Sequence, residues 1–513
     1  MSGRLMSFAE RTGRPLLAVI LLGVIIRLIL APTLTFNIDI AYWAEVIDVF
    51  QNGFGLYGTA GYYYTPIWGY CLGFIAFVMQ ILGITDFGTF APELYHLVNE
   101  DFKISAFVTS IEFNTILKLL LIAVDVAVGI VIYRFVMKHT DDEKKGCFAA
   151  LLWMLSPLVI TQSSVHGMFD NISALLILLT VMSAIDRRYF IAGALFALAV
   201  LTKFFPLFFA FLLIAFVLKK EGVNLNGARK LLKAVVGFFA TAVIVYIPNI
   251  VNGDFWDSFY FLAYRIGIDR GTLNSITPMQ TAMIIAVTLM IVILVLVIIA
   301  KYGERIMAYA HTVDPEVRNR KVATVLLAVA LLLIVASFVR TILSSEELSF
   351  TSLGFGAVAA ISIFSIFLEL YLAYRLLMSE NDGDAHRLTF LFLTATAVIL
   401  WPCAPSYVLV MVPFVICYAV ISDTSFVKPY LVMSIAMTFM EITAYMTSPT
   451  SLIMALTGDV SVMVPVYEFL ALPVLGGITG TMILTGITGT IAYLSMIYIP
   501  FRWYREYRRG NVP

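Results

Sequence analysis

The sequence contains 513 residues, of which 61% are hydrophobic and only 13% are charged. Soluble globular proteins carry about 25% charged residues, so a soluble globular chain is excluded. The formal net charge is zero, from 33 basic and 33 acidic residues, which removes any electrostatic case for nucleic-acid binding. The composition therefore predicts an integral membrane protein whose partners are membrane lipids and substrates in or outside the membrane.

The cysteines and the first residues give no sign of a disulfide-rich secreted protein. No Cys-x-x-Cys spacing occurs, so neither a disulfide framework nor a zinc site is indicated, and no metal or cofactor is expected. Residues 1–14 form a short basic start before an apolar run, without a small-residue cleavage site that leads to a soluble domain. We interpret that run as a retained first span. The cysteines are interpreted as small core residues: Cys71, Cys147, Cys403 and Cys417.

Apolar stretches long enough to cross a membrane recur along the chain. A bilayer core needs ~20 apolar residues per helix, and counting such windows predicts an all-α membrane protein with about fourteen transmembrane helices. The predicted spans are residues 16–32, 111–133, 147–163, 171–186, 189–202, 204–218, 232–250, 279–300, 322–343, 353–377, 388–401, 405–421, 429–446 and 478–500.

Lys and Arg residues collect in every second loop between these spans. Because basic loops stay in the cytoplasm, both termini are predicted to be cytoplasmic and the alternate loops to face outside. One outside connection, residues 33–110, is much longer than the others, and long structured loops usually carry function. Within it, residues 67–82 are apolar, but a full span there would invert all later loops, so an interfacial or re-entrant helix is expected.

The chain shows no internal repeat and no low-complexity linker. We expect one membrane domain over residues 1–513, made of a motif-bearing module at 1–300 and additional helices at 301–513. Residues 464–500 are too long for one span and lack a polar turn for two, and their spread of glycines permits close helix packing.

Two candidate groups lie in the long outside loop. Asp39, just after the first span, could act as a general base on an acceptor hydroxyl, although a solvated loop acid or a helix cap is the simpler interpretation. Residues 55–70 are rich in tyrosine and glycine and contain Tyr63 and Tyr64, while Trp43 lies nearby. Such rings either form an interfacial belt or offer a platform for a sugar, and composition favours neither.

Two further candidates lie at predicted outside helix ends. The segment SVHGMFDNIS (residues 164–173) places His166 and Asp170 in one tight turn, where a turn cap is the alternative. Lys203, in LTKFFPLFF, has no acid beside it in the sequence, so its ammonium could bind an anion, or it could extend to the membrane interface.

The outside loop 251–278 contains YRIGIDRGTLNSIT, in which Arg265 and Arg270 flank Asp269. Arginine forks match phosphate oxygens, whereas an Arg265–Asp269 ion pair on a short helix is the alternative. Other charged residues lie inside the predicted spans, where pairing between helices is expected rather than catalysis. These are Arg27, Lys118, Asp125, Glu369 and Glu441.

The order of these motifs resembles the GT-C superfamily of polytopic membrane glycosyltransferases, which use polyprenyl-phosphate sugars as donors. The acid after the first span, the Tyr-rich stretch with its Thr65-Pro66 turn, SVHGMFDNIS, LTKFFPLFF and YRIGIDRGTLNSIT are similar to successive family segments, and the likeness covers about the N-terminal half. SVHGMFDNIS has Met168 where the family has Gln, and CAPSYVLVMVP has Ser406 where the family often has a charged residue.

The resemblance implies roles for the candidates. Asp39 would be the catalytic base, and Lys203, Arg265 and Arg270 would hold the donor phosphate. The residues expected to bind substrate are Trp43, Tyr63, Tyr64, His166 and Asp170.

The resulting hypothesis is an inverting transferase that moves a hexose, mannose in first place, from a polyprenyl-phosphate sugar to an extracytoplasmic glycan, lipid or protein. The membrane would be the plasma membrane of a prokaryote or else the ER membrane. The alternatives are a transporter or lipid flippase without covalent chemistry, against which the absence of a repeat weighs, and a membrane scaffold.

Overall fold

The computed structural model describes residues 14–53, 55–57, 62–92, 94, 106–260, 263, 270–344, 350–379, 383–399, 405–444, 449–475 and 478–508. The chain divides into two compact units, and each is described by itself. Unit 1 contains residues 1–62, 68–175 and 404–513, and unit 2 contains residues 63–67 and 176–403. The C-terminal helices thus belong to the unit that contains the N-terminus. The predicted division at residue 300 stays a prediction.

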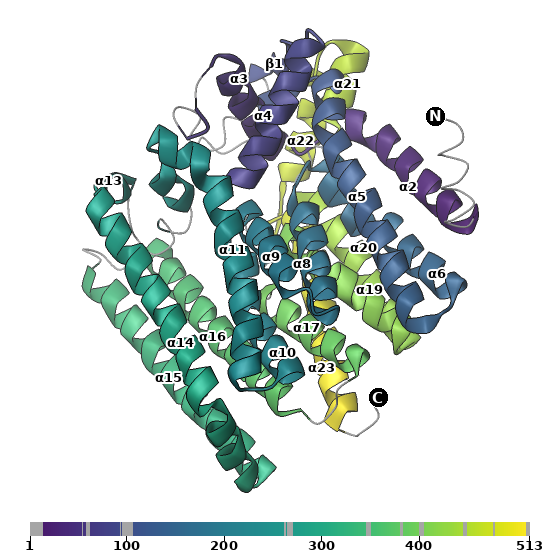
Figure 1. Ribbon diagram of the computed structural model, residues 1–513. Helices are drawn as coiled ribbons and strands as arrows, with labels where there is room; N and C mark the ends of the chain where they lie inside the picture. Colours follow the sequence, from purple (N-terminus) through teal and green to yellow (C-terminus); the bar gives the residue numbers. More distant parts are fainter. Residues whose placement is uncertain are drawn as a thin grey trace, which may run out of the picture. The chain divides into compact units, whose positions relative to one another are not determined.

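Most elements of unit 1 are helices, and its first half contains the long connection between α2 and α5 (Figure 1). These elements are α2 Arg14–Thr33, α3 Asn37–Gln51, α4 Pro66–Ile81, β1 Gly88–Phe90, β2 Phe107–Thr109, α5 Ile111–Thr140, α6 Glu143–Met154, α7 Pro157–Ile160, the π-helix η3 Thr161–Val165 and α8 Asp170–Ile185. Unit boundaries fall within α4, before Trp68, and within α8, after Leu175.

The C-terminal part of unit 1 adds further helices and one short ribbon. These elements are α18 Pro405–Val408, α19 Val412–Ile421, η6 Thr424–Phe426, α20 Val427–Ala444, α21 Thr450–Thr457, η7 Ser461–Met463, α22 Val464–Ala471, β3 Pro473–Leu475, β4 Ile478–Thr479 and α23 Gly480–Arg508. Helix α2 packs against α5 and α6, α19 packs against the same two helices, and α20 runs along α23.

Unit 2 is built of helices in its described residues. They are α9 Tyr189–Thr202, η4 Phe205–Phe209, α10 Ala210–Glu221, α11 Leu225–Asn252, η5 Phe255–Phe259, α13 Arg270–Asn274, α14 Pro278–Thr312, α15 Pro315–Ser344, α16 Phe350–Met378 and α17 Asp384–Ile399. Helix α9 lies beside α11, and α15 lies beside α16 (Figure 1). The close approach of α9 to α11 needs glycine, because a Cβ on Gly193 would lie 1.9 Å from the carbonyl oxygen of Ala234.

Several helices suit a bilayer in length and composition, which confirms the predicted all-α multi-pass membrane fold. Among the described residues, seven helices pass this test, and eight if the bent pair α6 with α7–η3 is one span. Shorter apolar helices coincide with other predicted spans. For example, α9 has the same bounds as the span predicted at residues 189–202. The total of fourteen spans stays a prediction.

Local signals explain where the important helices begin. Ser110 precedes α5 and its hydroxyl accepts from the Phe113 N–H, while the carboxylate of Asp142 accepts from the first amides of α6. The Ser156-Pro157 pair ends α6 and starts α7, because Pro cannot continue the first helix but suits the first turn of the next. The resulting bend between the two helices is 48°.

The long connection before α5 contains helices, as expected. Helix α4 confirms the helix predicted at residues 67–82, although its depth in the membrane stays a prediction. A two-stranded ribbon, which the sequence did not indicate, pairs β1 with β2 in antiparallel register from Gly88–Thr109 to Phe90–Phe107. Gly88 is required there, since its φ is +153° and a Cβ would lie 2.2 Å from the Val108 carbonyl oxygen.

Candidate functional site

Asp39 lies in the first turn of α3, the helix that follows the first span within unit 1. Phe36 occupies the N-cap position with extended backbone, so the amides of the first turn point toward the helix start. A carboxylate in this turn is favoured by the helix dipole. Asp39 is half-buried, so part of this residue is exposed.

The turn predicted from SVHGMFDNIS packs against this helix start. The ring of His166 lies 5.1 Å from the ring of Phe36. Gly167 has φ +69°, and a Cβ there would lie 2.3 Å from Cδ1 of Ile40. Residues on both sides of Asp39 thus contact the turn, and the contact with Ile40 requires glycine at residue 167.

Aromatic rings fill the space next to this contact. Trp68 stacks on Phe169 with ring centroids 4.8 Å apart and planes 8° from parallel. Trp43 meets both rings edge-on, at 5.6 Å from Trp68 and 5.8 Å from Phe169. All three side chains are fully buried, so this cluster fixes α3 and α4 against the turn. A role for Trp43 in binding substrate stays a prediction.

The turn is also held by a buried acid from a distant part of the sequence. Nδ1 of His166 lies 2.6 Å from Oε2 of Glu441 on α20, and the side-chain amide of Gln162 donates to the same oxygen at 2.6 Å. Sequence reasoning expected Glu441 to pair with another charged residue inside a span and did not connect it with His166. The sequence did indicate that Glu441 has a partner, because an acid deep in an apolar segment needs one.

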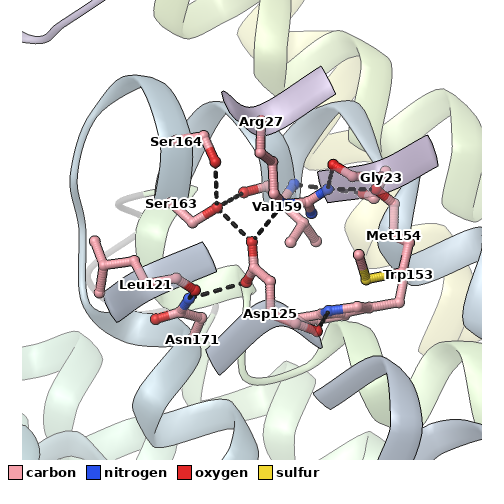
Figure 2. Close-up of polar contacts among 11 residues, drawn as sticks. Gly23, Arg27, Leu121, Asp125, Trp153, Met154, Val159, Ser163, Ser164 and Asn171 are labelled. Atoms are coloured by element: carbon pink, nitrogen blue, oxygen red, sulfur yellow. Dashed lines mark hydrogen bonds and ion pairs between the residues drawn. The ribbon is translucent and has the colours of Figure 1, made fainter. Parts of the chain in front are cut away.

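A second acid holds the same turn from α5, shown in Figure 2. Asp125 accepts a 2.8 Å hydrogen bond from Nε of Arg27, a 2.5 Å bond from the Ser163 hydroxyl and a 2.9 Å bond from the Asn171 amide. The Arg27–Asp125 pair confirms the predicted pairing between spans. Lys118 instead donates to backbone carbonyl oxygens, at 2.9 Å and 2.7 Å, near the end of α2.

Asp170 and Lys203 occupy helix ends, as the sequence predicted. Asp170 is fully buried in the first turn of α8 in unit 1. Lys203 follows the last residue of α9 in unit 2 with extended backbone, and its side chain is buried. Its ammonium lies 5.9 Å from the ring centroid of Tyr64, and the Tyr64 ring lies 4.6 Å from that of Tyr63. A cation over a tyrosine face is a favourable arrangement.

The side chains of the remaining predicted donor-site residues lie outside the described part of the chain. Arg265 and its proposed partner Asp269 lie outside the described residues. Arg270 begins α13, Arg270–Asn274, and its side chain also lies outside the described part.

Unit 1 contains an open cavity of about 510 Å³ between α3 and the β1–β2 ribbon. Three carboxylates line it, from Glu45, Asp48 and Asp86, together with phenylalanine rings that include Phe87 and Phe107. Burial raises the pKa of Glu45 above its ordinary value. Within the described residues, no group of three or more His, Cys, Asp or Glu side chains is arranged to hold a metal ion.

The comparisons with known proteins give a family and a relative whose names refer to GPI. The family model "GPI transamidase subunit PIG-U" matches residues 39–280, a range that begins at Asp39 and includes every predicted site residue. GPI mannosyltransferase 1 of Candida albicans (strain SC5314 / ATCC MYA-2876) is 26% identical over 154 residues. That alignment covers 28% of this chain and 38% of the relative, so the chain matches well under half of the relative's length.

The chain resembles the GT-C membrane proteins. Both comparisons support this resemblance, and both concern proteins whose names refer to GPI. Glu441, which holds the turn next to Asp39, and Arg27, which pairs with Asp125, lie outside the matched range. The candidate residues therefore all lie in the range that the family model matches, and the packing of that range depends on residues beyond it.

Proposed function

We propose that this protein is an inverting glycosyltransferase that moves a hexose, mannose in first place, from a polyprenyl-phosphate sugar to an extracytoplasmic acceptor. The Asp39 carboxylate takes the proton of an acceptor hydroxyl while that oxygen attacks the anomeric carbon. The bond from the anomeric carbon to the phosphate oxygen breaks, and polyprenyl phosphate leaves. Attack opposite to the leaving group inverts the anomeric configuration.

The leaving phosphate gains negative charge as this bond breaks, and cations are needed to stabilise it. Lys203, Arg265 and Arg270 are the proposed phosphate ligands. The buried setting of Lys203 beside Tyr64 supports its role, because an ammonium outside bulk water attracts a phosphate more strongly than an exposed ammonium. Tyr63 and Tyr64 provide rings and hydroxyls suited to a sugar.

The observation that carries the proposal is the placement of Asp39. A half-buried carboxylate in a first helical turn is held on both sides by contacts of Phe36 and Ile40 with the turn of His166 and Gly167. Such support is what a catalytic base needs, since a general base must be fixed within hydrogen-bond reach of its proton. The name of the Candida relative supports mannose as the sugar.

A second candidate function follows from the longer match. Since the matched family is described as a GPI transamidase subunit, the protein could bind a glycolipid within a complex without transferring sugar. In either case, the proposed site faces the cell exterior in a prokaryote or the ER lumen in a eukaryote, which are topologically the same side.

Transfer from a labelled donor distinguishes the two functions. Purified protein in lipid nanodiscs is incubated with radiolabelled polyprenyl-phosphate mannose or polyprenyl-phosphate glucose and an extract of membrane glycolipids. Label in a new glycolipid with release of polyprenyl phosphate is the expected result, and mannose is the expected sugar. Saturable binding of glycolipid without transfer from either donor would favour the subunit role, and movement of intact donor across vesicles would favour a flippase.

A further inference from the structure

The structure contains a chain of contacts that connects a buried acid on α20 with the proposed catalytic base on α3. The acid is Glu441, which is 279 residues from Gln162 in the sequence and lies outside the range that the family model matches. Its side chain is 5% exposed, and the side chain of His166 is 3% exposed. Both groups are thus out of bulk water, where a hydrogen bond to a carboxylate is strong.

The first link is between Glu441 and the turn. One carboxylate oxygen, Oε2, lies 2.6 Å from Nδ1 of His166 and accepts a 2.6 Å hydrogen bond from the Gln162 amide. A carboxylate accepts only, so Nδ1 carries the proton in this contact. Glu441 therefore fixes both the orientation of the imidazole and the position of its proton.

The local backbone explains why both side chains reach the same acid. Residues 161–165 form a π-helix, and the amide of His166 donates to the Thr161 carbonyl oxygen at 2.8 Å. The wider turn rotates successive side chains relative to an α-helix, and such turns occur often at functional sites. Here Gln162 and His166 both contact Glu441, while Ser163 donates to Asp125 on α5.

The second link is between the turn and α3. His166 contacts Phe36 at a ring distance of 5.1 Å, and Gly167 packs against Ile40. Asp39 lies between Phe36 and Ile40 in the sequence, so the backbone on each side of it is held by the turn. A shift of the His166 ring would move the start of α3 and the carboxylate with it.

We propose that Glu441 is a positioning residue for the transfer reaction, acting through His166 on the first turn of α3. This inference rests on the proposed function, because it assigns Asp39 as the base. Glu441 does not touch the substrate in this account. Its role is to hold the imidazole that fixes Phe36, and so to keep the Asp39 carboxylate in reach of the acceptor hydroxyl.

The main test is Glu441→Gln, which keeps the volume and one acceptor oxygen but removes the charge. Because a misplaced base slows the chemical step, kcat is expected to fall about tenfold with the donor KM unchanged. Phe36→Leu, which breaks the next link without touching Glu441, is expected to lower kcat in the same way. This second variant keeps the test informative if Glu441→Gln does not fold.

Ser434→Ala is the matched control. Ser434 lies seven residues before Glu441 on the same helix, is fully buried, and makes a 2.9 Å hydrogen bond with the Ser156 hydroxyl. Its loss is expected to lower the unfolding temperature without changing kcat. If Glu441→Gln behaves like this control, with a lower unfolding temperature and a wild-type kcat, the positioning role is wrong.

A spectroscopic readout tests the contact without any turnover. The chain has only 5 histidines, so ¹⁵N-histidine labelling gives few imidazole signals, and His166→Gln assigns the signal of His166. The wild-type signal is expected to show a protonated Nδ1, and Glu441→Gln should change it toward a mixture of tautomers. An unchanged His166 signal in Glu441→Gln would also overturn the inference.

The two proposals fail in different ways. Transfer that survives Asp39→Asn contradicts the proposed function itself. Transfer that depends on Asp39 but has wild-type kcat in Glu441→Gln contradicts only the positioning role.

Discussion

Nε of Arg27 on α2 lies 2.8 Å from Oδ2 of Asp125 on α5, and both side chains are fully buried (Figure 2). The guanidinium also donates to the carbonyl oxygens of Gly23 and Met154, at 3.1 Å and 2.6 Å. Asp125 also accepts from Ser163 in η3, directly before the turn that packs against α3. This ion pair therefore ties the first span to the helices that hold the candidate site.

Breaking this pair is expected to destabilise the protein strongly. Asp125→Asn leaves the Arg27 charge buried without its counter-charge, which costs about 3–5 kcal/mol of unfolding free energy. The double variant Arg27→Met with Asp125→Asn removes both charges and should lose less unfolding free energy than Asp125→Asn alone. Unfolding in mixed detergent micelles measures both values. A loss below about 1 kcal/mol in Asp125→Asn would show that the pair contributes no more than a surface ion pair.

Gly167→Ala tests the contact between the turn and α3. The new Cβ would lie 2.3 Å from Cδ1 of Ile40, in addition to the strain of φ +69°. We expect a loss of about 2–4 kcal/mol, of which about 1–2 kcal/mol comes from the backbone. Gly53→Ala is the control, since Gly53 has φ +79° and no neighbouring atom within 4 Å of its Cβ position. Thermal unfolding compares the two.

Ile40→Val tests whether Cδ1 of Ile40 causes the loss of stability in Gly167→Ala. This change removes Cδ1, and the next atom of Ile40 lies 3.5 Å from the Cβ position on Gly167. The double variant Gly167→Ala with Ile40→Val should therefore recover much of the stability lost in Gly167→Ala. Additive losses in the double variant would mean that the clash with Ile40 is not the cause.

Lys203→Met tests the proposed phosphate ligand. Methionine keeps the length of the buried stem and removes the charge, so kcat/KM for the polyprenyl-phosphate donor should fall about 10²-fold. Lys203→Arg keeps the charge and should retain more activity than Lys203→Met. Steady-state kinetics at fixed acceptor concentration gives both values. Equal activity of Lys203→Met and the wild type would remove Lys203 from the donor site.

Glu45 makes stability depend on pH in a defined direction. Burial raises its pKa in the folded protein, so the folded state favours the protonated carboxyl. The contribution of Glu45 to the free energy of unfolding is fully present below the unfolded-state pKa. It is lost as pH rises through the folded-state pKa. The unfolding temperature of the wild type should thus fall relative to Glu45→Gln as pH rises through this window, and the difference should be constant at lower pH. A difference independent of pH contradicts this account.

Asp459 makes stability depend on pH in the opposite direction and serves as a control. Its carboxylate accepts from the Ser461 hydroxyl at 2.5 Å and from the Ser461 amide at 2.8 Å, and these bonds lower its pKa. Its contribution is present above the unfolded-state pKa and is lost as pH falls through the folded-state pKa. Relative to Asp459→Asn, the wild type should therefore lose stability on acidification. A wild type that loses stability as pH rises would contradict the assignment.

The sequence predicted the helices well because a membrane imposes a simple rule on composition. Ranges such as Tyr189–Thr202 and Pro66–Ile81 follow from apolar length and from helix-ending residues. The β1–β2 ribbon was not predicted, because its strands have three residues each and are separated by a long stretch of chain. Such pairing depends on tertiary contact rather than on local pattern.

The candidate residues came from local sequence motifs, and their roles stay predictions. Asp39 and His166 belong to recognisable local motifs, and the structure connects them through Phe36. Glu441 was found as a buried charge, but its partner could not be chosen, since sequence does not show which faces of α20 and η3 meet. Helix period predicts which residues share a face and leaves the neighbour of that face undetermined.

The most direct test of Asp39 as the catalytic base compares two carboxylates on the same helix. Asp39→Asn and Asp48→Asn make the same chemical change on α3, and Asp48 lines the open cavity beyond the first turn. With radiolabelled polyprenyl-phosphate mannose as donor, Asp39→Asn is expected to lower transfer by about 10³-fold or more while Asp48→Asn retains it, with both proteins folded. Wild-type transfer by Asp39→Asn would contradict the account.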